Sequence, residues 1–81
     1  MAFVAIDSEG GRYEYRGHQV RFEFYTGDDG RVSKLVIHYP QELFAGRVDP
    51  DFLRQGWADR ATALQAAMDR AAQVMDRKLN R

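Results

Sequence analysis

The sequence predicts an α+β fold, in which a four-stranded antiparallel β-meander is covered on one face by a long C-terminal helix. Glycine-bearing reversals separate segments that alternate polar and apolar residues, as half-buried strands do. Apolar residues then recur at spacings of three and four, which is typical of an amphipathic helix. We expect one domain, residues 1–81, with the meander at 1–39, a connector at 40–48 and the helix at 49–80.

Four segments of the N-terminal half are predicted to be strands. They are residues 3–7, 12–16, 19–26 and 31–39, and Pro40 ends the last one. The reversals between them fall at Ser8–Gly11, at the dipeptide Gly17–His18 and at Gly27–Gly30.

Closing the strands over these turns gives a register that can be tested. It places Tyr15 opposite Val20, Tyr13 opposite Phe22, Glu14 opposite Arg21, Phe22 opposite Leu35, Val20 opposite Ile37 and Ile6 opposite Tyr13. The three turns then agree on one apolar face of the sheet. This agreement supports the register, because a slip of one residue at any turn would invert every side chain. The expected inner face is Val4, Ile6, Tyr13, Tyr15, Val20, Phe22, Phe24, Leu35 and Ile37.

The helix is expected to begin after Asp49, which suits an N-cap, with Pro50 in its first position. Its apolar stripe is Trp57, Ala61, Leu64, Met68, Ala71 and Met75. Gly56 interrupts the pattern, so a bend is expected there. Before the helix, residues 41–45 are expected to form a single helical turn that Gly46 ends.

Arg60 projects from the apolar stripe and leaves two interpretations open. Its stem can pack while the guanidinium reaches solvent. Alternatively the group is buried, either in an ion pair or stacked on a tyrosine.

The predicted helix is longer than the sheet that covers it. Residues 51–79 would span about 43 Å, against about 23 Å for a seven-residue strand. Either the helix bends or frays after Met75, or the overhang packs against a second copy. We favour the second reading and predict a homodimer. The residues assigned to self-association are Ala67, Ala71, Val74, Met75 and Leu79.

Composition narrows the function classes. Twelve basic residues balance twelve acidic ones, which disfavours nucleic acid and anionic membranes as partners. The chain has no cysteine, and its start has neither the basic region nor the apolar length of a signal peptide. No stretch approaches a membrane span. We therefore expect a cytoplasmic protein without a membrane segment.

The sequence carries no recognisable catalytic pattern. His18 and His38 lack the spacing of metal ligands, and the serines lack a histidine at a recognisable spacing. Turn chemistry explains Asp28, Asp29 and Gly30 better than a calcium loop does. We expect no cofactor, no metal and no catalytic residues, which disfavours an enzyme; an enzyme or ligand-binding subunit stays open as an alternative and would need a pocket near Arg60, Tyr13 and Tyr15.

The outer face of the sheet is the most informative surface. The residues predicted to bind a protein partner are Tyr25, Val32, Val36, Arg21, Lys34 and His38. Two alternatives stay open: a solvated face joined by cross-strand charge pairs, or a nucleic-acid surface on which bases stack on Tyr25. The preferred hypothesis is a non-enzymatic interaction module that self-associates through its helix.

Overall fold

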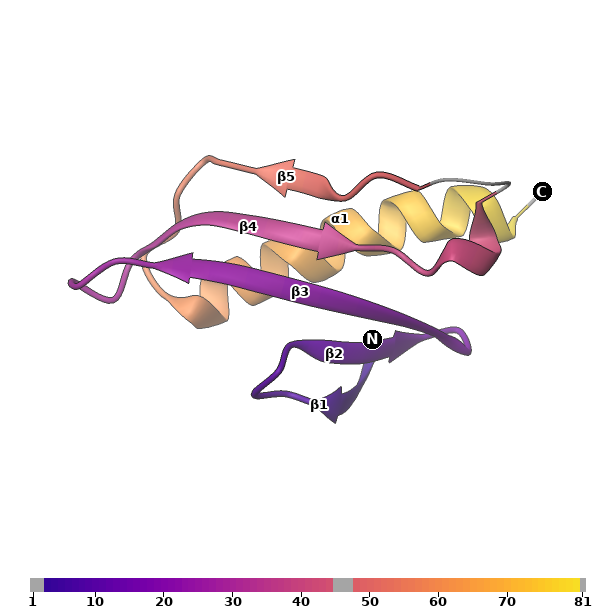
Figure 1. Ribbon diagram of the computed structural model, residues 1–81, viewed down its shortest axis with the longest axis horizontal. Coiled ribbons are helices and arrows are strands. Elements are labelled where there is room, and N and C mark those ends of the chain that lie inside the picture. The colour runs from indigo at the N-terminus through magenta and orange to yellow at the C-terminus, as the bar shows by residue number, and fades with distance from the viewer. Residues whose placement is uncertain (1–2, 45–47, 81) are drawn as a thin grey trace.

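The fold is α+β, with one antiparallel sheet and a C-terminal helix, as the sequence predicted (Figure 1). The computed structural model describes residues 3–44 and 48–80. Over these residues the sheet has five strands in the order β1-β2-β3-β4-β5, one more than expected. The elements are β1 (Phe3–Asp7), β2 (Arg12–Tyr15), β3 (His18–Thr26), β4 (Val32–His38), the 3₁₀ turn η1 (Gln41–Leu43), β5 (Asp51–Leu53) and α1 (Arg60–Leu79).

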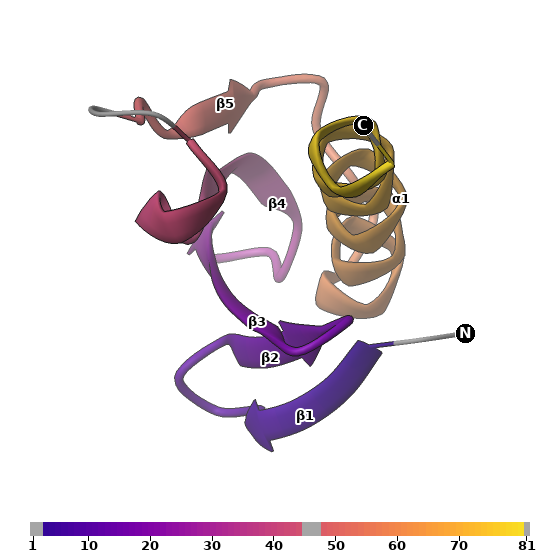
Figure 2. The ribbon, with the colours of Figure 1, turned by 90° about the vertical axis from the view of Figure 1, so that its right-hand side faces the viewer.

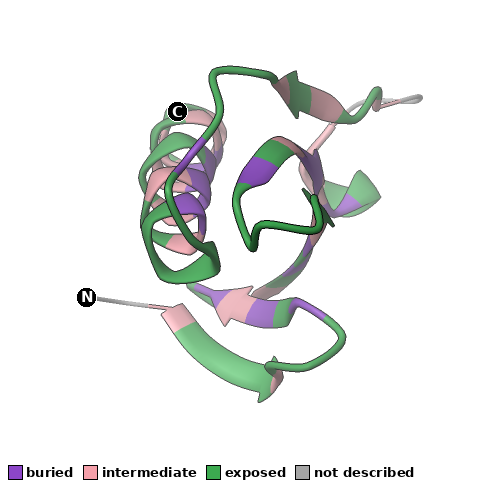
Figure 3. Cartoon of the chain, turned by 90° about the vertical axis from the view of Figure 1, so that its left-hand side faces the viewer, coloured by how far each residue is buried: buried purple, intermediate pink, exposed green. Residues whose placement is uncertain are grey.

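The sheet curls around α1, and the core lies between the two (Figure 2). The buried side of the helix faces the sheet in Figure 3. The largest side chains that are fully buried are Phe22, Val32, Leu35, Ile37 and Met75. The 20 residues of α1 span about 30 Å, as do the nine of β3, so the prediction that the helix is longer than the sheet was wrong.

The segment expected to open the helix is instead an edge strand. Residues 51–53 pair with β4, with Phe52 opposite Val36. Helical geometry also cannot pass Gly56, whose φ is +84°. The helix begins at Arg60, and its N-cap is Asp59, whose side chain accepts from the Thr62 N–H at 2.8 Å. The assignment of Asp49 as the cap was therefore wrong.

Two hairpins are offset by two residues from the predicted register. Tyr13 lies opposite Val20, and Phe22 lies opposite Ile37. The turn between β2 and β3 is Arg16–Gly17, with φ of 52° and 85°, rather than Gly17–His18. Because side chains alternate with a period of two, an offset of two keeps each residue on its predicted face. The predicted inner face is confirmed for Tyr13, Tyr15, Val20, Phe22, Leu35 and Ile37, which are all buried.

Bulges explain where the predicted faces were wrong. The register of β1 shifts between Ala5 and Asp7, and Val4 and Ile6 are 60% and 44% exposed rather than buried. Phe3 packs inward instead, stacked on Tyr15 at 4.5 Å between ring centroids. A second shift near Thr26 moves Val32 into the core.

The buried stripe of α1 consists of Ala63, Ala67, Ala71 and Met75, at successive spacings of four. In the predicted stripe, Ala61 is exposed, and Leu64 and Met68 are only partly buried. Alanines at the contact let the helix approach the sheet closely. The expected turn at 41–45 is present as η1, while Ala45 and Gly46 lie outside the described residues.

Candidate protein-contact surfaces

The outer face of the sheet does not carry the predicted apolar patch. Val32 and Val36 are 1% and 2% exposed. Val32 bridges to Trp57 and belongs to the core. Val36 lies opposite Glu23 on one side and Phe52 on the other, and these larger neighbours flank it. Neither valine can contact a partner, so this part of the prediction was wrong.

The structure brings the predicted residues Tyr25 and Lys34 together with Phe52, which the sequence analysis did not include. The Lys34 ammonium lies 4.1 Å from the centroid of the Tyr25 ring and 5.8 Å from that of Phe52. Both rings are about half exposed. Phe52 was missed because its segment was assigned to the helix. Its position after a proline and before a glycine was the available signal for a short edge strand.

A polar group adjoins these rings. Glu23 accepts from the Tyr25 hydroxyl at 3.0 Å, and its other oxygen lies 3.1 Å from His38 Nε2. The hydrogen bond with His38, followed by that from Tyr25, lowers the pKa of the Glu23 carboxyl below its ordinary value. Arg21 is exposed and lies opposite Arg12 rather than Glu14, because the register is offset by two.

The helix surface assigned to self-association is mostly used inside the molecule. Ala67, Ala71 and Met75 are completely buried against the chain's own sheet. Val74 and Leu79 are partly buried. A second copy cannot reach the first three residues, so this helical seam is wrong for them.

Arg60 is exposed, which excludes the interpretation in which it is a buried polar residue. Its guanidinium stacks over Phe24 at 5.0 Å rather than over a tyrosine, and Nη2 donates to the Ser8 carbonyl at 3.2 Å. The interpretation in which the charge reaches solvent is confirmed.

Two polar clusters tie α1 to the sheet. Asp76 accepts from the Tyr15 hydroxyl at 2.7 Å and from Arg16 Nη1 at 2.9 Å. On the opposite flank, Asp51 accepts from Arg70 Nε at 2.7 Å and from the Tyr39 hydroxyl at 2.9 Å. Burial, and then the bond to Asp51, raises the pKa of Tyr39 far above its ordinary value. The clusters fix the rotation of the helix, because they lie on its two sides.

We expect acid to weaken the fold through the Asp76 carboxylate. The Tyr15 hydroxyl, and then Arg16, lowers the pKa of Asp76 below its ordinary value of 3.8. A group with a lowered folded pKa stabilises above its unfolded pKa, and this stability is lost as pH falls through the folded value. Urea midpoints followed from neutral pH to below 3.8 should fall less steeply in Asp76→Asn than in the wild type. Asp69→Asn, which removes an exposed carboxylate that accepts from Gln65, is the control and should keep the wild-type slope. Equal slopes for Asp76→Asn and wild type would contradict the assignment.

Strand β1 exposes more apolar side chains than any other described strand. Val4, Ala5 and Ile6 are all exposed, and among the described residues no strand pairs with the outer edge of β1. Strand edges of this kind are templates for pairing with another chain. β1 also lacks the lysine or proline that commonly guards such an edge.

The described residues contain no group of three or more metal-ligating side chains, and none of their helices is long and apolar enough to cross a membrane. Comparison with protein-family models, with curated proteins and with solved structures gives no match to this chain.

Proposed function

We propose that this chain is a small, non-enzymatic protein–protein interaction module, and that it self-associates through the edge of β1. The observation that carries the proposal is the exposure of Val4 and Ile6, 60% and 44%, on an edge strand. The C-terminal helix contributes only a flank, near Leu79, instead of a seam of its own. The cytoplasmic location expected from the sequence remains part of the proposal.

Backbone alternation specifies how two copies of β1 would pair. The Phe22 N–H donates to Gly11 at 2.8 Å, so β3 directs Phe22 and alternate residues toward β2. The backbone N–H and C=O groups of Tyr13 and Tyr15 then point toward β3, and those of Glu14 point toward Val4 of β1. The N–H and C=O groups of Phe3 and Ala5 therefore point to the outer edge.

A two-fold axis at Val4 satisfies these groups in both copies. Phe3 of each copy would face Ala5 of the other, and the two Val4 side chains would meet on the outer face of a continuous sheet. The flank of α1 that carries Ala72, Asp76 and Leu79 lies on the same side of the molecule, because Asp76 binds Tyr15. Its partly buried apolar residues would be covered by the second copy.

Light scattering after size exclusion tests the proposal. The wild type should approach twice its 9.3 kDa mass as its concentration rises. Val4→Lys should hold the mass at that of a monomer, since it opposes two ammonium groups at the axis. The control is Phe52→Lys, the same kind of change on an exposed residue of the other edge strand, which should dimerise as the wild type does.

Circular dichroism should show that both variants stay folded, because each changes an exposed side chain. A monomeric wild type at every concentration would contradict self-association. A Val4→Lys variant that still dimerises would exclude the β1 edge as the interface, but not self-association itself.

The nucleic-acid alternative has less support. Lys34 lies over the Tyr25 ring on which a base would stack, and the Tyr25 hydroxyl is bound to Glu23. The chain's basic and acidic residues also balance. Titration with single-stranded oligonucleotides at two salt concentrations tests it, and salt-dependent binding would favour this function over the first.

A further inference from the structure

Strand β3 extends past the end of β2 and leaves a notch in the sheet. The β2–β3 ladder ends where Arg12 faces Arg21, with one further bond from the Phe22 N–H to the Gly11 carbonyl. There the chain turns away from β3 into the β1–β2 turn. Among the described residues, no strand lies beside the remainder of β3, up to Thr26, on this side.

The backbone of Phe24 offers a donor and an acceptor to the notch. Residues of a strand direct their N–H and C=O groups to alternate sides. The Phe22 N–H points toward Gly11, so the N–H and C=O of Phe24 point the same way, beyond the end of β2. A residue of an added strand opposite Phe24 could therefore form two backbone hydrogen bonds.

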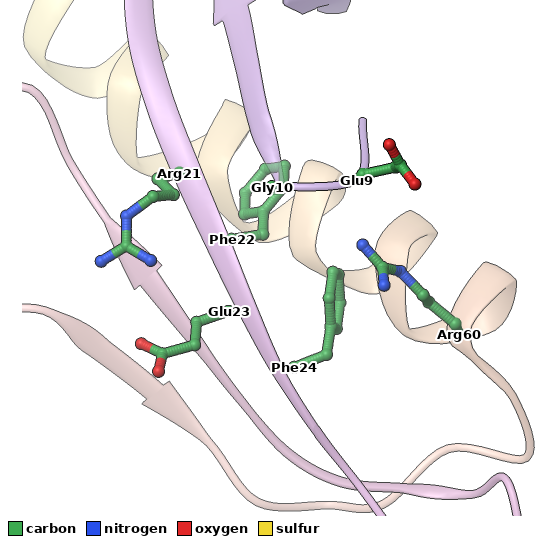
Figure 4. Close-up of a pocket in the computed structure, with 7 residues that line it drawn as sticks. All are labelled: Glu9, Gly10, Arg21, Phe22, Glu23, Phe24 and Arg60. Atoms are coloured by element: carbon green, nitrogen blue, oxygen red, sulfur yellow. The ribbon is translucent and has the colours of Figure 1, made fainter. Parts of the chain in front are cut away.

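A cavity of about 180 Å³ lies at this position. Figure 4 shows it between Gly10 of the β1–β2 turn, the β3 residues Phe22 and Phe24, and the side chain of Arg60 from the start of α1. Arg21 and Glu23 also line it, with their side chains directed to the other side of β3 from Arg60. Its size suits the last residues of an extended peptide rather than a folded domain.

The charges around the cavity favour an anionic group. Arg60 is held by the Ser8 carbonyl and the Phe24 ring, and its guanidinium keeps further donors. Arg60 forms no ion pair within the described residues. Glu23 already accepts from Tyr25 and adjoins His38, which leaves Glu9 as the opposing charge at the rim.

We propose that this notch binds the carboxyl-terminal residues of a partner polypeptide, added antiparallel along β3 with the terminal carboxylate at Arg60. An antiparallel addition runs in the direction of β2, and so toward Gly10 and Gly11. The chain itself blocks the way there, so the added strand must end. Its end in that direction is a carboxyl terminus, and the Arg60 guanidinium matches its charge. This site does not depend on self-association through β1.

The test uses synthetic peptides. An array of octapeptides with randomised last residues and free carboxyl termini is screened with the intact protein, and the strongest sequence is made in fluorescein-labelled form. Fluorescence polarisation should show saturable binding, weakened roughly tenfold or more when the carboxylate is replaced by an amide. The proposal would be overturned if no peptide of the array binds, or if the amide form binds as tightly as the free carboxylate.

Variants assign the binding to the notch. Arg60→Gln should weaken binding roughly tenfold, whereas Glu9→Gln should strengthen it by removing a like charge. Arg54→Gln, an exposed arginine near Phe52 on the β5 side, is the matched control and should bind as the wild type does. Unchanged binding by Arg60→Gln would place the peptide elsewhere. All of these side chains are exposed, and circular dichroism should report folded protein.

Val4→Lys separates this inference from the proposed function. Its change lies on β1, away from the β3 notch, so it should bind the peptide as the wild type does. Loss of binding in this variant would overturn the independence of the two sites. Peptide binding by a wild type that proves monomeric would support the notch while contradicting the dimer.

Discussion

Replacing Met75 by alanine is expected to lower the free energy of unfolding by about 2–5 kcal/mol. Met75 is completely buried at the end of the alanine stripe, and its thioether fills space that no neighbouring alanine can reach. Urea unfolding followed by circular dichroism measures the loss. Met75→Glu is expected to be more damaging, because it buries a carboxylate in the core.

Met68→Ala is the matched control for that loss. It makes the same chemical change on the same helix, but Met68 is only partly buried. Its cost should be well below that of Met75→Ala, since the transfer and cavity contributions both shrink with exposure. Equal losses at the two positions would contradict the helix orientation. A Met75→Glu variant that folds normally would contradict the burial of Met75.

Replacing Gly11 by alanine is expected to destabilise the protein by several kcal/mol, through two effects. Gly11 has a φ of 77°, where an L-residue costs about 1–2 kcal/mol. Its new methyl carbon would also collide with the Phe22 carbonyl oxygen, so β2 and β3 must separate or the turn must distort. Urea unfolding of the variant measures the sum.

Gly17→Ala isolates the first of these effects. Gly17 has a similar φ of 85°, but an added methyl group would meet nothing within 4 Å. Its loss should therefore stay near the backbone cost alone, about 1–2 kcal/mol. A Gly11→Ala variant no less stable than Gly17→Ala would show that the β1–β2 turn does not approach β3 so closely.

The alternation of apolar and polar residues was enough to predict most of the sheet's inner face. Two hairpins were offset by two residues, yet Tyr13, Phe22 and Leu35 still face the helix. An offset of two residues leaves each side chain on its predicted face, whereas a bulge inverts the faces of the residues beyond it. Val4 and Val32 were misplaced because each lies beside a bulge.

The candidate sites were predicted less well than the fold. Tyr25 and Lys34 do lie together, but the valines expected beside them are buried, and Phe52 completes the group. The local signal at Asp49–Pro50 fits a helix start, and Asp59 competes with it for the same role. Nothing local reveals that β4 needs another strand beside it, which residues 51–53 supply.

By itself, the sequence determined that an antiparallel sheet is covered by a C-terminal helix, because turns, alternation and helical spacing are local properties of the chain. The tertiary structure decided where the helix begins, which of its residues are buried and which strand edges remain open. These depend on contacts between residues far apart in sequence: β5 beside β4, Trp57 beside Val32, and Asp76 beside Tyr15. A pattern read along one segment carries no information about the surface that will lie against it.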